Sequence, residues 1–152
     1  VVGPLELVPL LPPGTSLTVE EPPGSGPVAG LAAGLALLPD VEKVAVVGGD
    51  LPFLDASTVD LLRSSLSVDH DGAVLVDDGG RPQWLCGVWW HAALRDRLAK
   101  LGDPAGRSLR ELVAGLRVAH VSSPLPGPPA WFDCDTADDL RLAEEMADGG
   151  TG

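Results

Sequence analysis

The stretch Lys43–Leu54, KVAVVGGDLPFL, decides the fold. Val44 to Val47 is an uninterrupted apolar run rich in β-branched residues, which is typical of a strand buried on both faces in a parallel sheet. Gly48 and Gly49 end this run and allow the backbone to turn sharply. We therefore expect an α/β fold with Val44 to Val47 in the interior of the sheet.

Asp50 follows the glycine pair directly, at the carboxyl end of the predicted strand. Ligands bind at this edge in open α/β sheets. A carboxylate here is suited to holding Mg²⁺ against phosphates, because Mg²⁺ is bound by one or two carboxylates plus substrate oxygens. The alternative is that Asp50 only caps the helix that follows, and the stretch by itself favours neither interpretation. Phe53 and Leu54 are expected to pack the loop down.

A second strand–loop–helix pattern precedes the first. Leu17 to Glu20 alternates apolar and polar residues and predicts a short strand, and Gly24 and Gly26 make the loop flexible. Pro27 suits the first turn of a helix, which Val28, Leu31, Leu35 and Leu38 continue at helical spacing. The start of a helix offers free N–H groups to an anion such as phosphate. An ordinary turn between a strand and a helix has the same pattern.

The rest of the chain alternates strands with helices. Ala73 to Val76 and Gln83 to Trp89 predict a hairpin, which would be one antiparallel element in a mostly parallel sheet. Four helices are expected: one that begins at Asp55 or Ser57, one over His91 to Leu101, one from Ser108 through Leu116, and one with its N-cap at Thr136. Arg117 to Val121 predicts a further strand, and Val1 to Gly3 predicts the end of another. Leu5 to Leu11 contains and adjoins prolines and predicts a loop or a short turn.

Length and composition restrict the class of protein. The 152 residues predict one domain, 1–147, with a frayed tail over 148–152. A formal net charge of −12 argues against non-specific binding to nucleic acid or to an anionic membrane. No apolar run approaches the roughly 18 residues of a membrane span, and no secretory signal is visible. Cys86 and Cys134 predict reduced thiols in a cytoplasmic protein, with a disulfide as the alternative.

Three motifs, in this order and spacing, resemble the molybdenum cofactor guanylyltransferase (MobA-type) family of nucleotidyltransferases. They are GSGPVAGLAAGL, GGDLPFL and FDCDTADDL, and the GPVAG of Gly26–Gly30 is the most specific. The resemblance spans nearly the whole chain. It implies a Rossmann-like three-layer sandwich with a mostly parallel sheet. It also implies an enzyme that transfers GMP from Mg-GTP to molybdopterin and releases pyrophosphate.

The resemblance also implies roles for residues. Asp50 would be the catalytic residue and would hold Mg²⁺, with Asp135 as a candidate second ligand, for which helix capping is the alternative. The base-side acidic residue would be Glu20 or Glu21. The other nucleotide-binding residues would be Gly24, Gly26, Pro27 and Gly30, and the substrate-side residues would be Gln83 and Asp133.

The sequence departs from the family in three places. The family's first glycine-rich loop, which cradles the triphosphate, is expected upstream of Val1 in a unit of roughly 40 residues. The chain without this unit is therefore expected to be inactive. A Glu stands where the family usually has Asp, and Asp133 and Asp135 replace asparagines, as in the related cytidylyltransferases. CTP thus stays an alternative to GTP. Sugar-nucleotide transfer on the same fold and a non-catalytic interaction domain also stay open.

Overall fold

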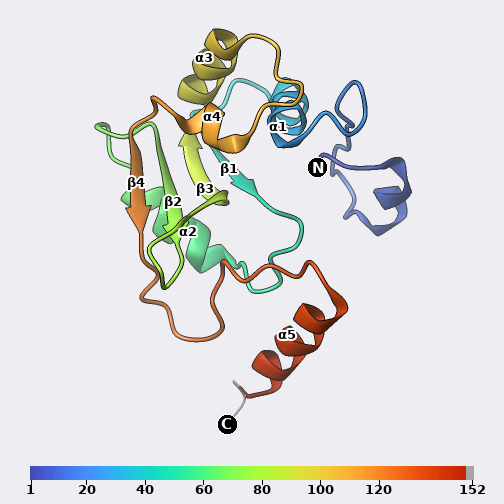
Figure 1. The fold of residues 1–152 in the computed structure, drawn as a ribbon, viewed down its shortest axis with the longest axis vertical. Helices are drawn as coiled ribbons and strands as arrows, with labels where there is room; N and C mark the ends of the chain where they lie inside the picture. Colours follow the sequence, from blue (N-terminus) through green and yellow to red (C-terminus); the bar gives the residue numbers. More distant parts are fainter. Residues whose placement is uncertain (150–152) are drawn as a thin grey trace. The chain divides into compact units, whose positions relative to one another are not determined.

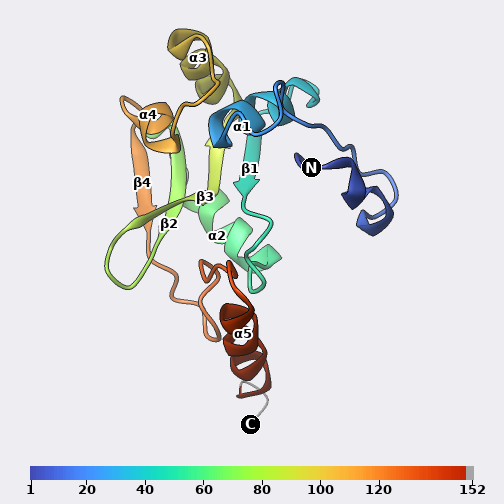
Figure 2. The same ribbon diagram turned by 45° about the vertical axis from the view of Figure 1, so that its right-hand side comes forward.

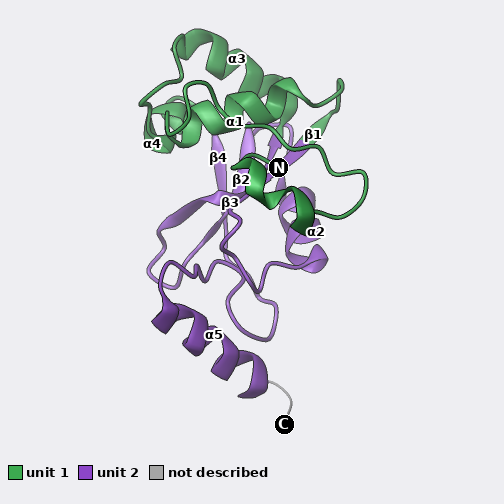
Figure 3. Cartoon of the chain, turned by 90° about the vertical axis from the view of Figure 1, so that its right-hand side faces the viewer, with its two compact units in different colours: residues 1–43, 90–116 green, residues 44–89, 117–152 purple. Residues whose placement is uncertain are grey.

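The computed structural model describes residues 1–149. They form two units, which Figure 3 shows in different colours. The first unit comprises residues 1–43 and 90–116, and the second comprises residues 44–89 and 117 to the C-terminus. The unit boundaries fall within β1 (Lys43–Val47) and β3 (Pro82–Trp90), each of which gives one terminal residue to the first unit.

The second unit is built on a mixed four-stranded sheet of order β1-β3-β2-β4. β2 (Gly72–Val76) runs antiparallel to β3 and parallel to β4 (Val118–Val121). β1 is antiparallel to β3, because Gly48 N–H donates to Leu85 C=O at one end of the pair (2.7 Å) and His91 N–H donates to Glu42 C=O at the other (3.0 Å). β1, β2 and β4 thus share one direction, as the arrows in Figure 1 show. This confirms the predicted α/β class and the antiparallel hairpin, while two of the three pairs of neighbouring strands in the described sheet are antiparallel.

The core of the second unit lies between β2 and α2 (Ala56–Ser65). Three successive β2 residues, Ala73, Val74 and Leu75, are fully buried, and α2 contacts both β2 and β4. α2 presents Leu62 to this core, also almost fully buried. The strand that is buried on both faces is therefore β2.

The prediction that Val44 to Val47 is buried inside the sheet is wrong. β1 is an edge strand of the described sheet, with β3 as its single neighbour, and Ala45 and Val47 are exposed. The physical reason is that a β-branched run favours extended backbone wherever the strand lies. The number of strands beside it depends on pairing with distant segments, which the run does not encode.

The first unit is largely helical. It contains the 3₁₀ helix η1 (Leu5–Leu10), α1 (Pro27–Ala36), α3 (His91–Leu101) and the short α4 (Leu109–Val113), and α4 contacts both α1 and α3. Arg97 on α3 fastens α4 by donating from Nε to Leu112 C=O and from its terminal nitrogen to Glu111 C=O, both at 2.7 Å. The helices predicted at Pro27 and His91 are thus confirmed.

Other predicted boundaries differ from the structure. The predicted loop over Leu5–Leu11 contains η1, and the two predicted strands near the N-terminus reduce to one isolated bridge between Val2 and Thr18. α4 stops at Val113, since Ala114 already has extended backbone, and Gly115 follows with a φ of +94° that few other residues adopt.

The last helix, α5 (Ala137–Gly149), includes the first two residues of the predicted frayed tail, and residues 150–152 lie outside the described part. In Figures 1 and 2 α5 lies beyond the carboxyl ends of β1, β2 and β4. Among the residues described, no helix has the length and apolar character needed to cross a membrane.

Candidate functional site

Asp50 lies in an exposed turn just beyond β1, at the edge of the sheet where the parallel strands end. Its carboxylate folds back over the end of the strand. A Cβ on Gly48 would lie only 2.4 Å from Asp50 Oδ1, so this position of the carboxylate depends on the missing side chain at residue 48.

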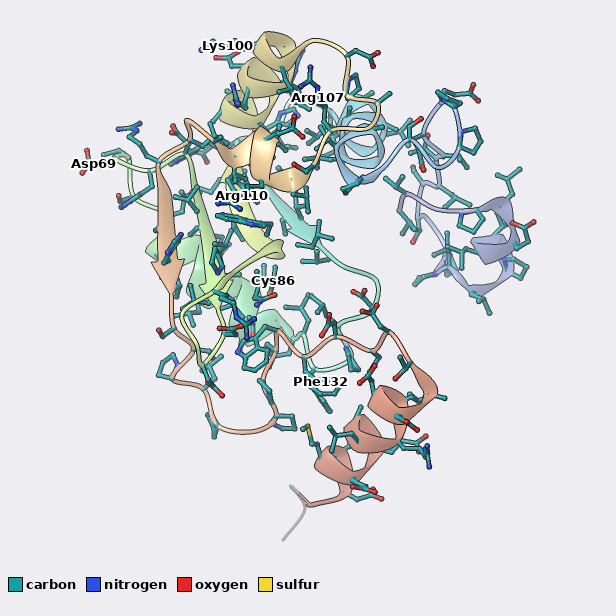
Figure 4. The ribbon with its side chains drawn as sticks, viewed as in Figure 1. Asp69, Cys86, Lys100, Arg107, Arg110 and Phe132 are labelled. Carbon is teal, nitrogen blue, oxygen red and sulfur yellow. The ribbon has the colours of Figure 1, made fainter. Side chains whose placement is uncertain are left out.

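Two contacts tie this turn to the segment that leads into α5. Cys134 N–H donates to Asp50 C=O at 3.0 Å. The rings of Phe53 and Phe132 meet with centroids 6.0 Å apart and planes tilted by 56°, an arrangement that aromatic pairs favour. Figure 4 shows Phe132 on the stretch between β4 and α5. The two loops, about eighty residues apart in the sequence, therefore form one surface.

Several carboxylates gather around the Cys134 thiol. Desolvation raises the pKa of this thiol most, and the negative charges of Asp139, Asp133, Asp50 and Asp135 raise it further. Asp50, Asp133 and Asp135 are exposed and lie within electrostatic reach of one sulfur atom. The Cys134–Asp50 hydrogen bond and the Phe53–Phe132 contact thus join the two distant segments that carry these three aspartates, while the functional roles of the aspartates stay predictions.

Other side chains occupy the helix caps. Asp55 caps α2, since its Oδ1 accepts from Thr58 N–H and from Thr58 Oγ1, both at 2.8 Å, and these bonds lower the Asp55 pKa. At α5, Asp139 accepts from Thr136 N–H at 2.8 Å and donates its own N–H to Thr136 Oγ1 at 3.2 Å. The caps of α2 and α5 are therefore supplied by Asp55 and Thr136, and the capping alternative for Asp50 and Asp135 is wrong.

This donor set fits a cation that is shared with a substrate. Carboxylate oxygens are the hard ligands that Mg²⁺ prefers, and Mg²⁺ keeps several waters or phosphate oxygens beside one or two carboxylates. Within residues 1–149, no three histidine, cysteine, aspartate or glutamate side chains are grouped so that they could bind a metal by themselves. Asp50 and Asp135 have the carboxylate oxygens that Mg²⁺ prefers, and the binding of Mg²⁺ by this pair stays a prediction.

The predicted nucleotide-binding residues lie in the first unit, in the turn before α1 and at the start of α1 itself. Glu20 Oε1 accepts from Gly24 N–H at 3.0 Å, and Gly24 and Gly26 take φ values of +79° and +94°, which explains why glycine is needed at both. Pro27 begins α1, and no side chain caps the helix. Gly30 lies on α1 near Val2. The turn therefore leaves the N–H groups at the start of α1 without a side-chain acceptor, while Glu20 supports the loop itself.

Gln83, predicted on the substrate side, lies on β3 near the hairpin turn. Its Nε2 donates to Asp77 Oδ2 and to Arg81 C=O, both at 3.4 Å. Asp77 also accepts from the Arg81 and Gly79 N–H groups, which hold its pKa below the usual range. Gln83 therefore helps to organise the turn, and a substrate contact stays a prediction.

The sequence did not reveal a hollow of about 410 Å³ in the second unit. Its lining includes Phe53, Asp78 and Trp131 together with much of the proline-rich segment 125–130. Prolines indicate a loop without indicating what the loop encloses, so the composition of this segment does not predict the hollow. The aromatic residues Phe53 and Trp131 were the available signal.

Solved nucleotidyltransferases share this fold. The structure matches molybdopterin-guanine dinucleotide biosynthesis protein A from Archaeoglobus fulgidus with a TM-score of 0.64 and 18% identity, covering 89% of this chain and 69% of that one. It matches 2-C-methyl-D-erythritol 4-phosphate cytidylyltransferase from Thermus thermophilus with a TM-score of 0.58 and 21% identity, covering 90% and 79%. At these identities the likeness concerns the fold alone.

Sequence comparison identifies the family. Residues 1–121 match the MobA-like NTP transferase domain, and the chain belongs to this family. It is 28% identical over 139 residues to a molybdenum cofactor guanylyltransferase of Bradyrhizobium, and 30% identical over 132 residues to one of Nitrobacter hamburgensis. The matches cover 88% and 82% of this chain, and 66% and 63% of the relatives. The chain thus spans about two thirds of the length of these curated relatives, and the predicted family resemblance is confirmed.

Proposed function

We propose that this protein acts in molybdenum cofactor guanylylation, transferring GMP from Mg-GTP to molybdopterin with release of pyrophosphate. Membership of the MobA-like family and the names of the two curated relatives support the reaction class. The structural observation that carries the proposal is the hydrogen bond from Cys134 N–H to Asp50 C=O, which holds the Asp50 turn against the segment with Asp133 and Asp135.

The proposed reaction is an in-line attack of a substrate phosphate oxygen on the α-phosphorus of the nucleotide. The new P–O bond forms as the bond to pyrophosphate breaks, and no side chain needs to act as a nucleophile. The tasks of the protein are to position the two substrates and to stabilise the charge that develops between them. Asp50 and Asp135 supply anionic oxygens at the sheet edge, while the turn at Gly24 and Gly26 supplies backbone N–H groups at the start of α1.

Mg²⁺ is the proposed cofactor, and Asp50 with Asp135 would hold it. When bound, it would neutralise phosphate charge as a Lewis acid. Asp133, which shares the short segment with Asp135, would face the acceptor substrate, as Gln83 would. The protein is proposed to work in the cytoplasm, where its two cysteines stay reduced; both Cys86 and Cys134 are free thiols in the structure.

CTP is the second candidate nucleotide. The aspartates at positions 133 and 135, which replace the asparagines of the guanylyltransferases, favour it. Cytidylyl or sugar-nucleotide transfer would use the same in-line chemistry. An interaction domain without activity is the candidate from a different class, and turnover measurements separate these three.

The test is turnover by the protein expressed from its complete gene. Pyrophosphate release is measured over a series of Mg²⁺ concentrations. GTP and CTP are each tested with molybdopterin as the acceptor, and each nucleotide is also tested with a sugar phosphate as the acceptor. We expect turnover with GTP and molybdopterin. Preference for CTP would transfer the proposal to the second candidate, and no turnover with any combination would favour the interaction domain.

Asp50→Asn is the decisive variant. Asparagine keeps the size and much of the hydrogen bonding of aspartate but removes an anionic ligand, so kcat should fall by two or more orders of magnitude, equivalent to about 3 kcal/mol of transition-state stabilisation. Asp60→Asn, at an exposed position of α2 that pairs with Arg63, is the matched control and should keep normal turnover. Normal turnover and normal Mg²⁺ dependence in Asp50→Asn would refute the metal role.

A further inference from the structure

His91 carries an unexplained buried polar atom. The residue is 2% exposed, and its Nε2 has no hydrogen-bond partner among the described residues. Its backbone is satisfied, since His91 N–H donates to Glu42 C=O. Buried polar atoms in folded proteins nearly always have a partner, and a specific exception calls for a ligand, an ion or a water molecule.

Two hollows of the first unit meet at His91. The first, about 350 Å³, is lined by His91 and Arg95 of α3 together with apolar side chains, among them Ala32, Leu35, Leu38 and Leu98. The second, about 420 Å³, is lined by His91 and Arg95 as well, but also by the acidic residues Asp40, Glu42 and Asp96. Both volumes are in the range of small-molecule pockets, roughly 300–1,000 Å³.

The two linings select different ligands. Acidic side chains make the second hollow unfavourable for an anion. The lining of the first hollow contains no acidic residue, and its single charged group is the Arg95 guanidinium. Within the part of the chain that the structure describes, no carboxylate forms an ion pair with Arg95. A planar guanidinium matches a carboxylate with two parallel hydrogen bonds.

We propose that the first hollow binds a small molecule with a short aliphatic body and one carboxylate group. The aliphatic body would lie on the alanine and leucine side chains of α1 and α3. The carboxylate would pair with Arg95, and one of its oxygens would accept a hydrogen bond from the N–H at His91 Nε2. Such a ligand accounts for the apolar walls, the unpaired cation and the unpartnered imidazole nitrogen together. The site is independent of the proposed nucleotidyl transfer, since none of the residues assigned to that reaction lines it.

The test uses hexanoate as the probe and NMR of the protein with ¹⁵N-labelled histidine. The chain has three histidines, so three sets of ring signals are expected. His70, whose Nδ1 lies 2.8 Å from Ser67 Oγ, and the exposed His120 serve as internal references. We expect hexanoate to shift the His91 Nε2 signal saturably while the other two stay in place. Hexanol, which lacks the charge, and inorganic phosphate, which lacks the aliphatic body, should give no saturable shift of His91.

Arg95→Gln and Lys100→Gln form a matched pair of variants. Both variants remove one positive charge from an exposed position of α3. Arg95 lines the hollow, whereas Lys100, labelled in Figure 4, does not. Arg95→Gln should weaken hexanoate binding about tenfold, as expected for the loss of a charge-assisted hydrogen bond, while Lys100→Gln should bind normally. The proposal is overturned if hexanoate leaves the His91 signal unmoved, as when a water molecule satisfies Nε2. Equal binding by the two variants, or an equal response to hexanol or phosphate, would also overturn it.

Discussion

Single glycines determine how closely side chains pack in the second unit. Gly72 pairs with Trp89 across the hairpin, and a Cβ on Gly72 would lie 2.0 Å from Trp89 Cε3. Trp89 is 2% exposed. The glycine at position 72 is therefore required by the indole ring that covers it and not by its own backbone angles.

Gly72→Ala should consequently destabilise the protein. Forcing an extra methyl group into a packed core costs about 1–3 kcal/mol, and this overlap is severe enough to place the cost at the upper end or beyond. The measurement is the free energy of unfolding in urea. Gly49→Ala is the control, because a Cβ on Gly49 meets no atom within 4 Å and its φ is not positive, so its stability should match the wild type. Equal midpoints for both variants would contradict the overlap.

At the scale of single elements, the helix ends follow directly from the local sequence. α4 is only five residues long, yet Ser108 and Glu111 form a complete capping box at its start. Ser108 N–H and Oγ donate to Glu111 Oε2, both at 2.9 Å, and Arg107 donates to Glu111 Oε1 at 3.0 Å. These bonds favour the ionised carboxylate. They lower the Glu111 pKa from 4.5 to about 2, with the Ser108 backbone bond as the largest cause.

The capping box predicts a specific pH dependence of stability. Because the pKa is lower in the folded state, the contribution of Glu111 is fully present above pH 4.5 and is lost as the pH falls towards 2. The stability difference between wild type and Glu111→Gln should be constant above this window and shrink within it, as followed by urea unfolding at each pH. Ser108→Ala should reduce the pH-dependent part. If the stabilities of wild type and Glu111→Gln changed in parallel between pH 4.5 and pH 2, Glu111 would not be the source of the pH dependence.

Local signals account for what the sequence predicted correctly. Pro27 and the apolar spacing after it located α1, the runs Ala73 to Val76 and Gln83 to Trp89 located the hairpin, and Thr136 located the start of α5. Contacts between distant segments were not predictable in this way. The edge position of β1, the pairing of Phe53 with Phe132, and the Cys134–Asp50 hydrogen bond each depend on a partner far along the chain.

The same limit explains what the sequence revealed of the candidate site. Asp50 stood out because a glycine pair and a strand precede it, whereas Asp133 and Asp135 stood out only through the family resemblance. His91 gave no local signal, since a histidine at the start of a helix does not show whether its ring will be buried. The hollow that His91 lines forms where α1 and α3 meet, and these helices lie more than fifty residues apart.

At the scale of the whole molecule, charge is the dominant property. Asp and Glu number 22 against 10 Lys and Arg, which gives a formal net charge of −12 at pH 7. Ion pairs such as Arg63–Asp60, Arg107–Glu111 and Arg117–Asp71 join exposed or partly exposed side chains and contribute little to stability. The folded state therefore carries a general self-repulsion that local pairs do not cancel.

Monovalent salt should stabilise the protein at pH 7. The Debye length falls from about 30 Å at 0.01 M to about 8 Å at 0.15 M, which screens the repulsion between distant carboxylates. The melting temperature should therefore rise over this range, as measured by differential scanning calorimetry. Sodium and choline chloride should act alike if screening is the cause. A falling melting temperature, or a response to sodium alone, would contradict this explanation.

The edge position of β1 in the described sheet also has a consequence for this chain at high concentration. An apolar strand with an unpaired side is a template on which a second chain can add in register, the first step towards fibrils. Val47, 44% exposed and near the end of this edge, is where a charge would interfere most simply. Val47→Lys should lengthen the lag before thioflavin fluorescence rises in concentrated samples, while Val68→Lys, at a position that is 83% exposed and outside every strand, should leave it unchanged. Equal lag times for the two variants would mean that fibril growth starts at another segment. A longer lag time for Val47→Lys alone would show that this single strand determines how soon a concentrated solution of the protein aggregates.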